Sequence, residues 1–324
     1  MANRIKYCLK VIAPWGVAAV ILAVEFYNID RKFFLASLNS ADLSIYIPLV
    51  VLFIFIWFFI ESFNLQTLYR YFGYRLHYKK ILEIRGATFL LMIVNYGLGA
   101  GGIAMYMKKD LGIPLLRSTS ILFYYMVVES SGISFLAVAG FLLAGESSQI
   151  QFWVIYLSLY LFLFYVLEIV FLKYIPPKGF LKKFISSRLV EPIRESTWAM
   201  FWGIFFQRIV YFMTFIVFFY FATRAFHMEI PLLTLTALVP IIFFVGNIPI
   251  TPFGLGTIQA GMLYFFKGYG TEANILAMSI VYTVSLMFFR ALIGLYFLKS
   301  VNNIRLNFED DTQEKIPTGM EYNR

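Results

Sequence analysis

Two glycine-rich breaks interrupt long apolar segments of this chain, and their sequences resemble each other. The first extends from Asn95 to Tyr106 and the second from Asn247 to Gly261, and each contains the tripeptide Gly-Leu-Gly. Backbone that leaves helical geometry inside a bilayer loses its own hydrogen bonds, so it must meet protein, water or a bound polar group. Paired breaks in corresponding halves of a chain are typical of the binding sites of transporters.

The composition places these breaks in a membrane. Hydrophobic residues make up 60% and charged residues only 14% of the 324 residues, whereas a soluble domain has about 25% charged residues. Several apolar runs approach the ~20 residues that a helix needs to cross a bilayer. We therefore expect an all-α polytopic membrane protein.

The apolar segments follow one another along nearly the whole chain. They are Val11–Asn28, Ile45–Leu68, Ile81–Met107, Thr119–Ala144, Phe152–Leu172, Thr197–Ala222, Leu232–Phe266 and Ala273–Leu298. The third contains the first break, and the seventh contains the second break and is too long for a single crossing.

Lysine and arginine concentrate in one set of connections, which the positive-inside rule assigns to the cytoplasm. This set comprises the N-terminus and residues 70–85, 108–117, 173–194 and 299–324. The other connections hold only Arg31, Lys32, Arg224 and Lys267.

This distribution predicts that two segments do not cross the membrane. Basic connections flank Ile81–Met107 on both sides, and poorly basic ones flank Leu232–Phe266. We expect each to form a re-entrant helical hairpin, the two entering from opposite faces, while the other six segments cross. The halves 11–144 and 152–298 then form an inverted-topology repeat. Eight simple crossings are the alternative, which breaks the charge rule at Lys108 and Lys109 or at the C-terminus.

Residues 1–306 are predicted to form a single membrane domain, followed by a disordered acidic tail at 307–324. The first apolar run lacks a small-residue cleavage site, so we interpret it as a retained span. Both termini are expected in the cytoplasm, and the protein in the plasma (inner) membrane.

The first break offers two interpretations. Gly97 and Gly101 form a small-xxx-small pair that could pack against a neighbouring helix. Alternatively, Gly97, Gly99, Gly101 and Gly102 expose amides at the start of a half-helix, whose positive dipole favours an anionic group such as a phosphate. Asn95, at the edge of the break, is a further candidate for substrate binding.

The second break carries stronger helix-ending signals. Thr251 and Pro252 are typical of an N-cap and a first helical position. The candidate substrate-binding residues here are Asn247, Thr251, Pro252, Gly254, Gly256, Thr257 and Gln259. Thr257 and Gln259 are expected on the first turns of a new half-helix. A kinked helix whose polar groups satisfy one another is the alternative.

Charged residues inside spans are expensive and need partners or a function. Arg290 and Arg208 could clamp a phosphate through two parallel hydrogen bonds. The alternative for Arg290 is a structural ion pair with Glu129. For Glu129 itself we favour a structural ion pair over a role in binding. Glu61 and Glu168 lie nearer the ends of spans and are expected to be solvated or locally paired.

Other chemistry is not indicated. Gly97 to Gly102 fits the dinucleotide pattern G-x-G-x-x-G, but no strand–turn–helix unit surrounds it. The single cysteine, Cys8, and the separated His77 and His227 make a metal site improbable. Basic residues are dispersed, which argues against nucleic-acid binding. We expect no cofactor, no metal, no catalytic residues and no enzymatic activity.

The second break, followed by Ala277 to Arg290 and Gly294, resembles the signature of a flippase-like membrane family that includes the transmembrane region of lysylphosphatidylglycerol synthases. The segment from Asn95 to Gly112 and then Glu129 resembles the weaker counterpart in the first half. Gln259 stands where the family usually has glutamate, Ser130 where arginine is common, and the first break lacks the family's proline and acidic–basic pair. The resemblance implies pseudo-symmetric halves with re-entrant helices that move lipids with polar headgroups.

From these patterns we expect the protein to translocate an anionic phospholipid or a lipid-linked headgroup between leaflets. Its partners would be membrane lipids and an envelope or lipid-modifying enzyme. Two alternatives are a transporter of a small soluble anion and a non-transporting partner of an envelope-biosynthesis enzyme. A membrane-embedded lipid transferase is less favoured, because no cluster of base and nucleophile is present.

Overall fold

The computed structural model describes residues 2–27, 29–94, 96–144, 149–174, 187–247 and 251–298. Within these ranges the regular structure is helical throughout, as the sequence predicts. In chain order, the elements are α1 (Ala2–Tyr27), α2 (Arg31–Ser40), α3 (Leu43–Tyr71), α4 (Tyr78–Val94), α5 (Tyr96–Leu111), α6 (Leu115–Ala144), α7 (Gln149–Tyr174), α9 (Glu191–Glu195), α10 (Trp198–Ala225), α11 (Leu232–Asn247), the 3₁₀ turn η2 (Pro252–Gly254), α12 (Thr257–Phe266) and α13 (Glu272–Leu298). The predicted tail at 307–324 lies outside the described residues.

Five of the helices in the described ranges are long and apolar enough to cross a bilayer, namely α3, α6, α7, α10 and α13. They coincide with five of the six predicted crossings. The sixth, Val11–Asn28, overlaps α1, whose segment Trp15–Tyr27 is apolar. The protein is therefore a multi-pass membrane protein, and the sixth crossing stays a prediction.

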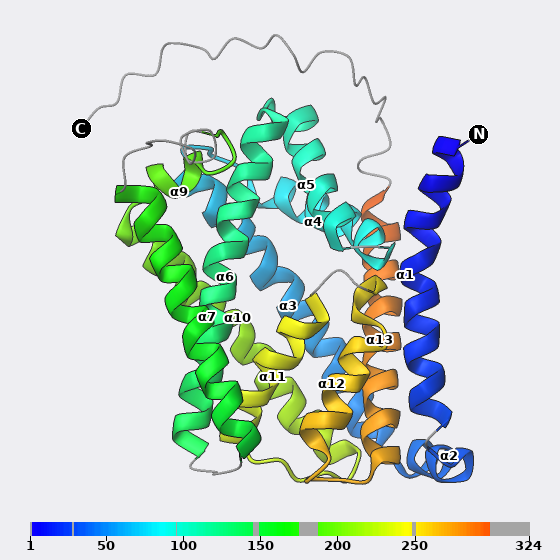
Figure 1. Cartoon of the computed structure of the whole chain (residues 1–324). Coiled ribbons are helices and arrows are strands. Elements are labelled where there is room, and N and C mark those ends of the chain that lie inside the picture. The colour runs from blue at the N-terminus through cyan, green and yellow to red at the C-terminus, as the bar shows by residue number, and fades with distance from the viewer. Residues whose placement is uncertain are drawn as a thin grey trace, which may run out of the picture.

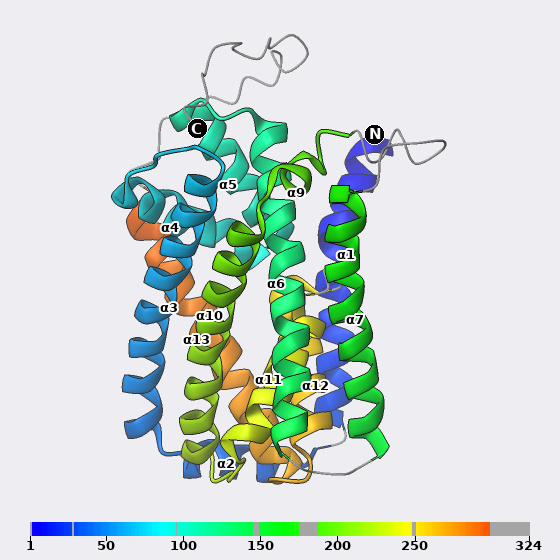
Figure 2. The same ribbon diagram turned by 90° about the vertical axis from the view of Figure 1, so that its left-hand side faces the viewer.

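Both predicted breaks divide their segments into separate helices. Ile81–Met107 becomes α4 and α5, and Leu232–Phe266 becomes α11, η2 and α12. The two helices of each pair pack against each other. In Figure 1 the α4–α5 pair occupies the upper part of the molecule, whereas the α11–α12 pair rises from the lower end. The view turned by 90° gives the same arrangement (Figure 2).

The long helices alternate in direction between the two ends. The start of α1 and the end of α13 both lie at the upper end in Figure 1. The short helix α2 lies at the lower end, where Asp42 caps α3 by accepting hydrogen bonds from the amide of Ile45 (3.3 Å) and the hydroxyl of Ser44 (2.6 Å). Capping of this kind satisfies amides that the helix itself leaves unbonded.

Glycines bring the helix backbones close where the two halves meet. A Cβ placed on Gly140 of α6 would lie 2.4 Å from the backbone nitrogen of Ala237 on α11. At the contact of α13 with α4, a Cβ on Gly294 would lie 2.6 Å from Cγ of Leu90, and one on Gly86 would lie 2.2 Å from Cδ2 of Phe297. Because little hydrophobic force acts between helices in lipid, close packing at small residues has to hold them together.

The Gly140 contact gives a testable prediction. In Gly140→Ala the added methyl group meets backbone that cannot turn aside, so we expect a loss of about 1–3 kcal/mol of stability. Thermal unfolding of the purified protein measures it. Gly132 lies on the same helix and is the matched control, because a Cβ there meets its nearest neighbour at an ordinary 3.7 Å. Equal unfolding temperatures for Gly140→Ala and Gly132→Ala would contradict the close crossing.

Candidate functional site

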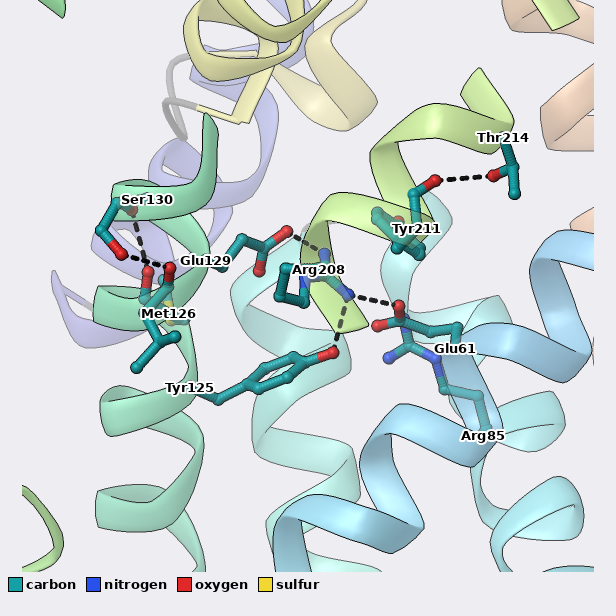
Figure 3. Close-up of polar contacts among 11 residues, drawn as sticks. Glu61, Arg85, Tyr125, Met126, Glu129, Ser130, Arg208, Tyr211 and Thr214 are labelled. Atoms are coloured by element: carbon teal, nitrogen blue, oxygen red, sulfur yellow. Dashed lines mark hydrogen bonds and ion pairs between the residues drawn. The ribbon is translucent and has the colours of Figure 1, made fainter. Parts of the chain in front are cut away.

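A buried network of charged side chains joins four helices inside the bundle (Figure 3). Arg208 on α10 is its centre, with only 1% of the residue exposed. Its Nη1 donates hydrogen bonds to Oε2 of Glu61 at 2.8 Å and to the hydroxyl of Tyr125 at 2.6 Å. Its Nη2 forms an ion pair with Glu129, one helical turn after Tyr125 on α6. Arg208 thus has an ionic or hydrogen-bonding partner on each of two helices of the first half.

Glu61 on α3 extends the network to the first hairpin. Its Oε1 accepts a hydrogen bond from Nη2 of Arg85 on α4 at 2.8 Å, while its Oε2 accepts the one from Arg208. Glu61 and Arg85 are each 4% exposed. One carboxylate therefore bridges two buried guanidinium groups.

Aromatic rings lie against the guanidinium groups of the buried arginines. The guanidinium carbon of Arg208 lies 3.7 Å from the ring centroid of Tyr211, and that of Arg290 on α13 lies 4.4 Å from the ring of Trp57. Phe89 lies 5.5 Å from the guanidinium carbons of both Arg85 and Arg290. Arg290 is also close enough to Glu61 for an electrostatic interaction. Desolvated cation–π contacts of this kind contribute about 2 kcal/mol each.

The cluster has more positive than negative formal charge. The three arginines at positions 85, 208 and 290 exceed the two glutamates at positions 61 and 129 by one. In addition, the Nε atoms of Arg85 and Arg208 are buried and have no hydrogen-bond partner in the described part of the chain. Buried donors are rarely left unused in native proteins. The cluster thus combines a positive excess with two unused N–H groups, which is the chemistry that binds an anion with several acceptor oxygens.

The first break packs on α4 through Gly99 and Gly102. Cβ atoms placed on Gly99 and Gly102 would lie 2.1 Å from Cγ of Met92 and 2.5 Å from Cδ1 of Leu91, so this pair holds α5 against α4. Gly101, in contrast, has nothing within 4 Å of a Cβ position. Gly97 and Gly101 are both exposed, and their packing as a pair stays a prediction. Asn95 lies outside the described residues.

The second break is a short irregular turn that begins as predicted. Thr251 precedes η2 with Pro252 as its first residue, and both are buried. Gly254 and Gly256 have positive φ angles of +69° and +87°, which only glycine adopts freely. Thr257 begins α12, as predicted. The side chain of Asn247 lies outside the described part of the structure.

The expectation that this break offers its amides to a ligand is wrong for three of them. The N–H groups of Gly254, Leu255 and Gly256 are donated to Thr251 O (3.4 Å), Pro252 O (2.9 Å) and Gln259 Oε1 (2.7 Å). Gln259 is fully buried, and its Nε2 also donates to the hydroxyl of Thr283 at 2.9 Å. Its amide thus joins the break to α13, which is a structural role.

A family model described as "Lysylphosphatidylglycerol synthase TM region" matches residues 11–294. The chain belongs to this family. A search of curated proteins found no match to it. The match includes both breaks and every member of the charged network, so the family's transmembrane region accounts for the whole helical core.

This lysylphosphatidylglycerol synthase TM-region protein uses its charged residues in pairs that the sequence did not reveal. Glu129 is in a structural pair, as favoured, but its partner is Arg208 rather than Arg290. Glu61 is neither solvated nor locally paired, since it is buried and binds an arginine 147 residues away. Glu168, half-buried on α7, is not part of the network.

Arg85, Tyr125 and Tyr211 were missed as site residues. We counted Arg85 among the basic residues of the connection 70–85, but its side chain lies buried within α4. Its place inside the apolar segment Ile81–Met107 was the signal that marked it as an intramembrane charge. Tyr125 lies four residues before Glu129, on the same helical face, which is the corresponding signal for that residue.

Removing Arg208 leaves two carboxylates buried without their main partner. We therefore expect Arg208→Met to lose about 3–5 kcal/mol of stability, or the folded protein altogether. Arg224→Met on the same helix is the matched control, because Arg224 is exposed and its guanidinium donates a hydrogen bond to the carbonyl of Tyr220 on its own helix. Thermal unfolding of the purified variants distinguishes the two. Equal stability of both variants would contradict the prediction that the buried network stabilises the folded protein.

Proposed function

We propose that this protein translocates an anionic phospholipid or a lipid-linked polar headgroup between the leaflets, without changing it chemically. The observation that carries the proposal is the buried network around Arg208, with its excess positive charge and the unused Nε donors of Arg85 and Arg208. A phosphate supplies the charge and the acceptor oxygens that this cluster lacks. We assign no enzymatic activity and no catalytic residue to the chain.

The proposed topology is an inverted repeat with two re-entrant hairpins, α4–α5 and α11–α12. Three packing relations support it: α6 packs on α11, α13 packs on α4 in the corresponding manner, and α3 packs on α10. Each hairpin then contacts the last span of the other half. The opposite ends from which the hairpins enter in Figure 1 favour the same arrangement.

The proposed cycle exchanges the partners of Arg208. In the described structure Glu61 and Glu129 satisfy it, and these carboxylates hold the arginine while no headgroup is bound. An entering phosphate replaces one carboxylate, while the acyl chains stay in lipid. Because either α3 or α6 of one half then loses its direct tie to α10 of the other, the halves rock and change the side from which the cluster is reached.

We place the protein in the plasma (inner) membrane with both termini in the cytoplasm, because the basic connections 70–85 and 108–117 and the start of α1 lie toward the same end of the molecule. Membrane lipids are the proposed ligands. An envelope or lipid-modifying enzyme that supplies or consumes the translocated lipid is the proposed protein partner.

A second candidate function is that of a non-transporting membrane partner for such an enzyme. It is favoured because both breaks contact other parts of the protein. Gly99 and Gly102 pack on α4, and Gln259 caps α12. In this role the charged network only fixes the helices relative to one another.

Reconstitution into liposomes with a leaflet-resolved lipid assay distinguishes the two. We expect the wild type to accelerate transfer of a labelled anionic phospholipid over a zwitterionic one, because only the anionic lipid compensates the positive excess. Arg290→Gln should slow transfer at least about tenfold, which corresponds to about 1.4 kcal/mol, and Arg224→Gln should not. Transfer at the protein-free rate by a folded wild type, for all lipids tested, would favour the non-transporting role.

A further inference from the structure

Helix α1 contacts the rest of the molecule through a narrow strip. Between Trp15 and Tyr27, only Ala18 and Glu25 are buried, at 1% and 9% exposure. Ile21 lies between them on the same face and is half-buried. The spacing of 18, 21 and 25 corresponds to one side of a helix. This side packs on η2 and α12.

The strip covers the second glycine-rich break. A Cβ placed on Gly256 would lie 3.0 Å from Cβ of Ile21 and 3.4 Å from the carbonyl oxygen of Ala18. Glu25 follows Ile21 by about one helical turn, so its carboxyl group lies one turn along the strip from this contact. The position of α1 therefore determines whether this side of the break is covered.

Both carboxyl oxygens of Glu25 are buried and have no hydrogen-bond partner among the residues that the structure describes. The buried carboxylates Glu61 and Glu129 each bind arginine, and Glu25 does not. Its packing partners offer no compensating charge: η2 has no titratable residue, and the only one on α12, Tyr264, is 59% exposed. The charged residues at the nearby helix ends are all exposed, namely Asp30, Arg31, Lys32, Lys267 and Glu272.

We propose that Glu25 is a proton-binding site that holds α1 against the second break. A buried carboxylate without a partner is far more unfavourable than the neutral acid. When the O–H bond breaks and the proton passes to water, the charge left on Glu25 has to reach water as well. The strip of α1 then separates from η2 and α12, and this uncovers Gly256. The inference does not depend on which molecule the protein transports, or on whether it transports one.

The proposal predicts that the stability of the folded protein decreases as pH rises. The folded protein holds this proton more tightly than the unfolded chain does, so the neutral site stabilises the fold at low pH, and this contribution is lost as pH rises. Glu25→Gln is neutral at every pH. We therefore expect the unfolding temperature of the wild type to fall relative to that of Glu25→Gln between about pH 4.5 and about pH 7, and the difference to stay constant above pH 7.

The test measures thermal unfolding and carboxyl infrared absorption on the full-length protein over this pH range. Glu229→Gln is the matched control, because Glu229 is an exposed carboxyl in the connection between α10 and α11, and it should follow the wild type in its pH dependence. The difference between the spectra of the wild type and Glu25→Gln should contain the C=O band of one protonated carboxyl at low pH, and this band should disappear as pH rises.

Parallel pH curves for the wild type and Glu25→Gln, with identical carboxyl bands, would overturn the proposal. If Glu25→Gln does not fold, Glu25→Asp replaces it. The protonated carboxyl band should then shift in Glu25→Asp, and an unshifted band would assign the proton to another group and overturn the proposal equally.

Discussion

The charge of Arg208 is the constraint on which the rest of the structure depends. A guanidinium in the middle of an apolar helix needs anionic partners, and the α10 helix that carries it has none facing that site. The partners come from α3 and α6 of the first half, and through Glu61 the interaction reaches Arg85 on α4. Helices from both halves must therefore converge on one point. Replacing such a cluster by apolar residues is often neutral or stabilising in other proteins, so its presence favours a functional role over a purely structural one.

The glycines explain how the helices come close enough to form this cluster. Gly140 allows α6 to touch the backbone of α11, and Gly86 and Gly294 allow α13 to lie on α4. These contacts position the last span of each half against the hairpin of the other half. The two breaks serve the same packing, since Gly99 and Gly102 close the α4–α5 pair and Gln259 ties the second break to α13. The breaks thus shape the protein around the charged cluster, and the cluster has unused N–H groups where three amides of the second break are already bonded.

Much of the fold could be predicted from the sequence, because hydropathy, charge bias and helix-ending residues are local signals. Segment length and the breaks near residues 95 and 250 correctly divided the apolar segments into helices, whereas the short helices α2 and α9 were not predicted. The pairing of charges could not be predicted, because Glu61 and Arg208 are 147 residues apart and nothing local encodes which faces meet. The packing of the glycines could not be predicted for the same reason. A run of glycines shows that a neighbour can approach the helix closely, but the rotation of the helix decides which of them face it. In this protein Gly99 and Gly102 face α4.

An experimental structure solved with an anionic phospholipid bound tests the central claim most directly. The claim is that Arg208 and Arg85 exchange a carboxylate for a headgroup phosphate. It predicts a phosphate within about 3 Å of a guanidinium nitrogen of one of these arginines, with Glu129 or Glu61 turned away from Arg208. Lipid phosphates confined to the outer surface of the helices, beside an unchanged set of ion pairs around Arg208, would contradict it.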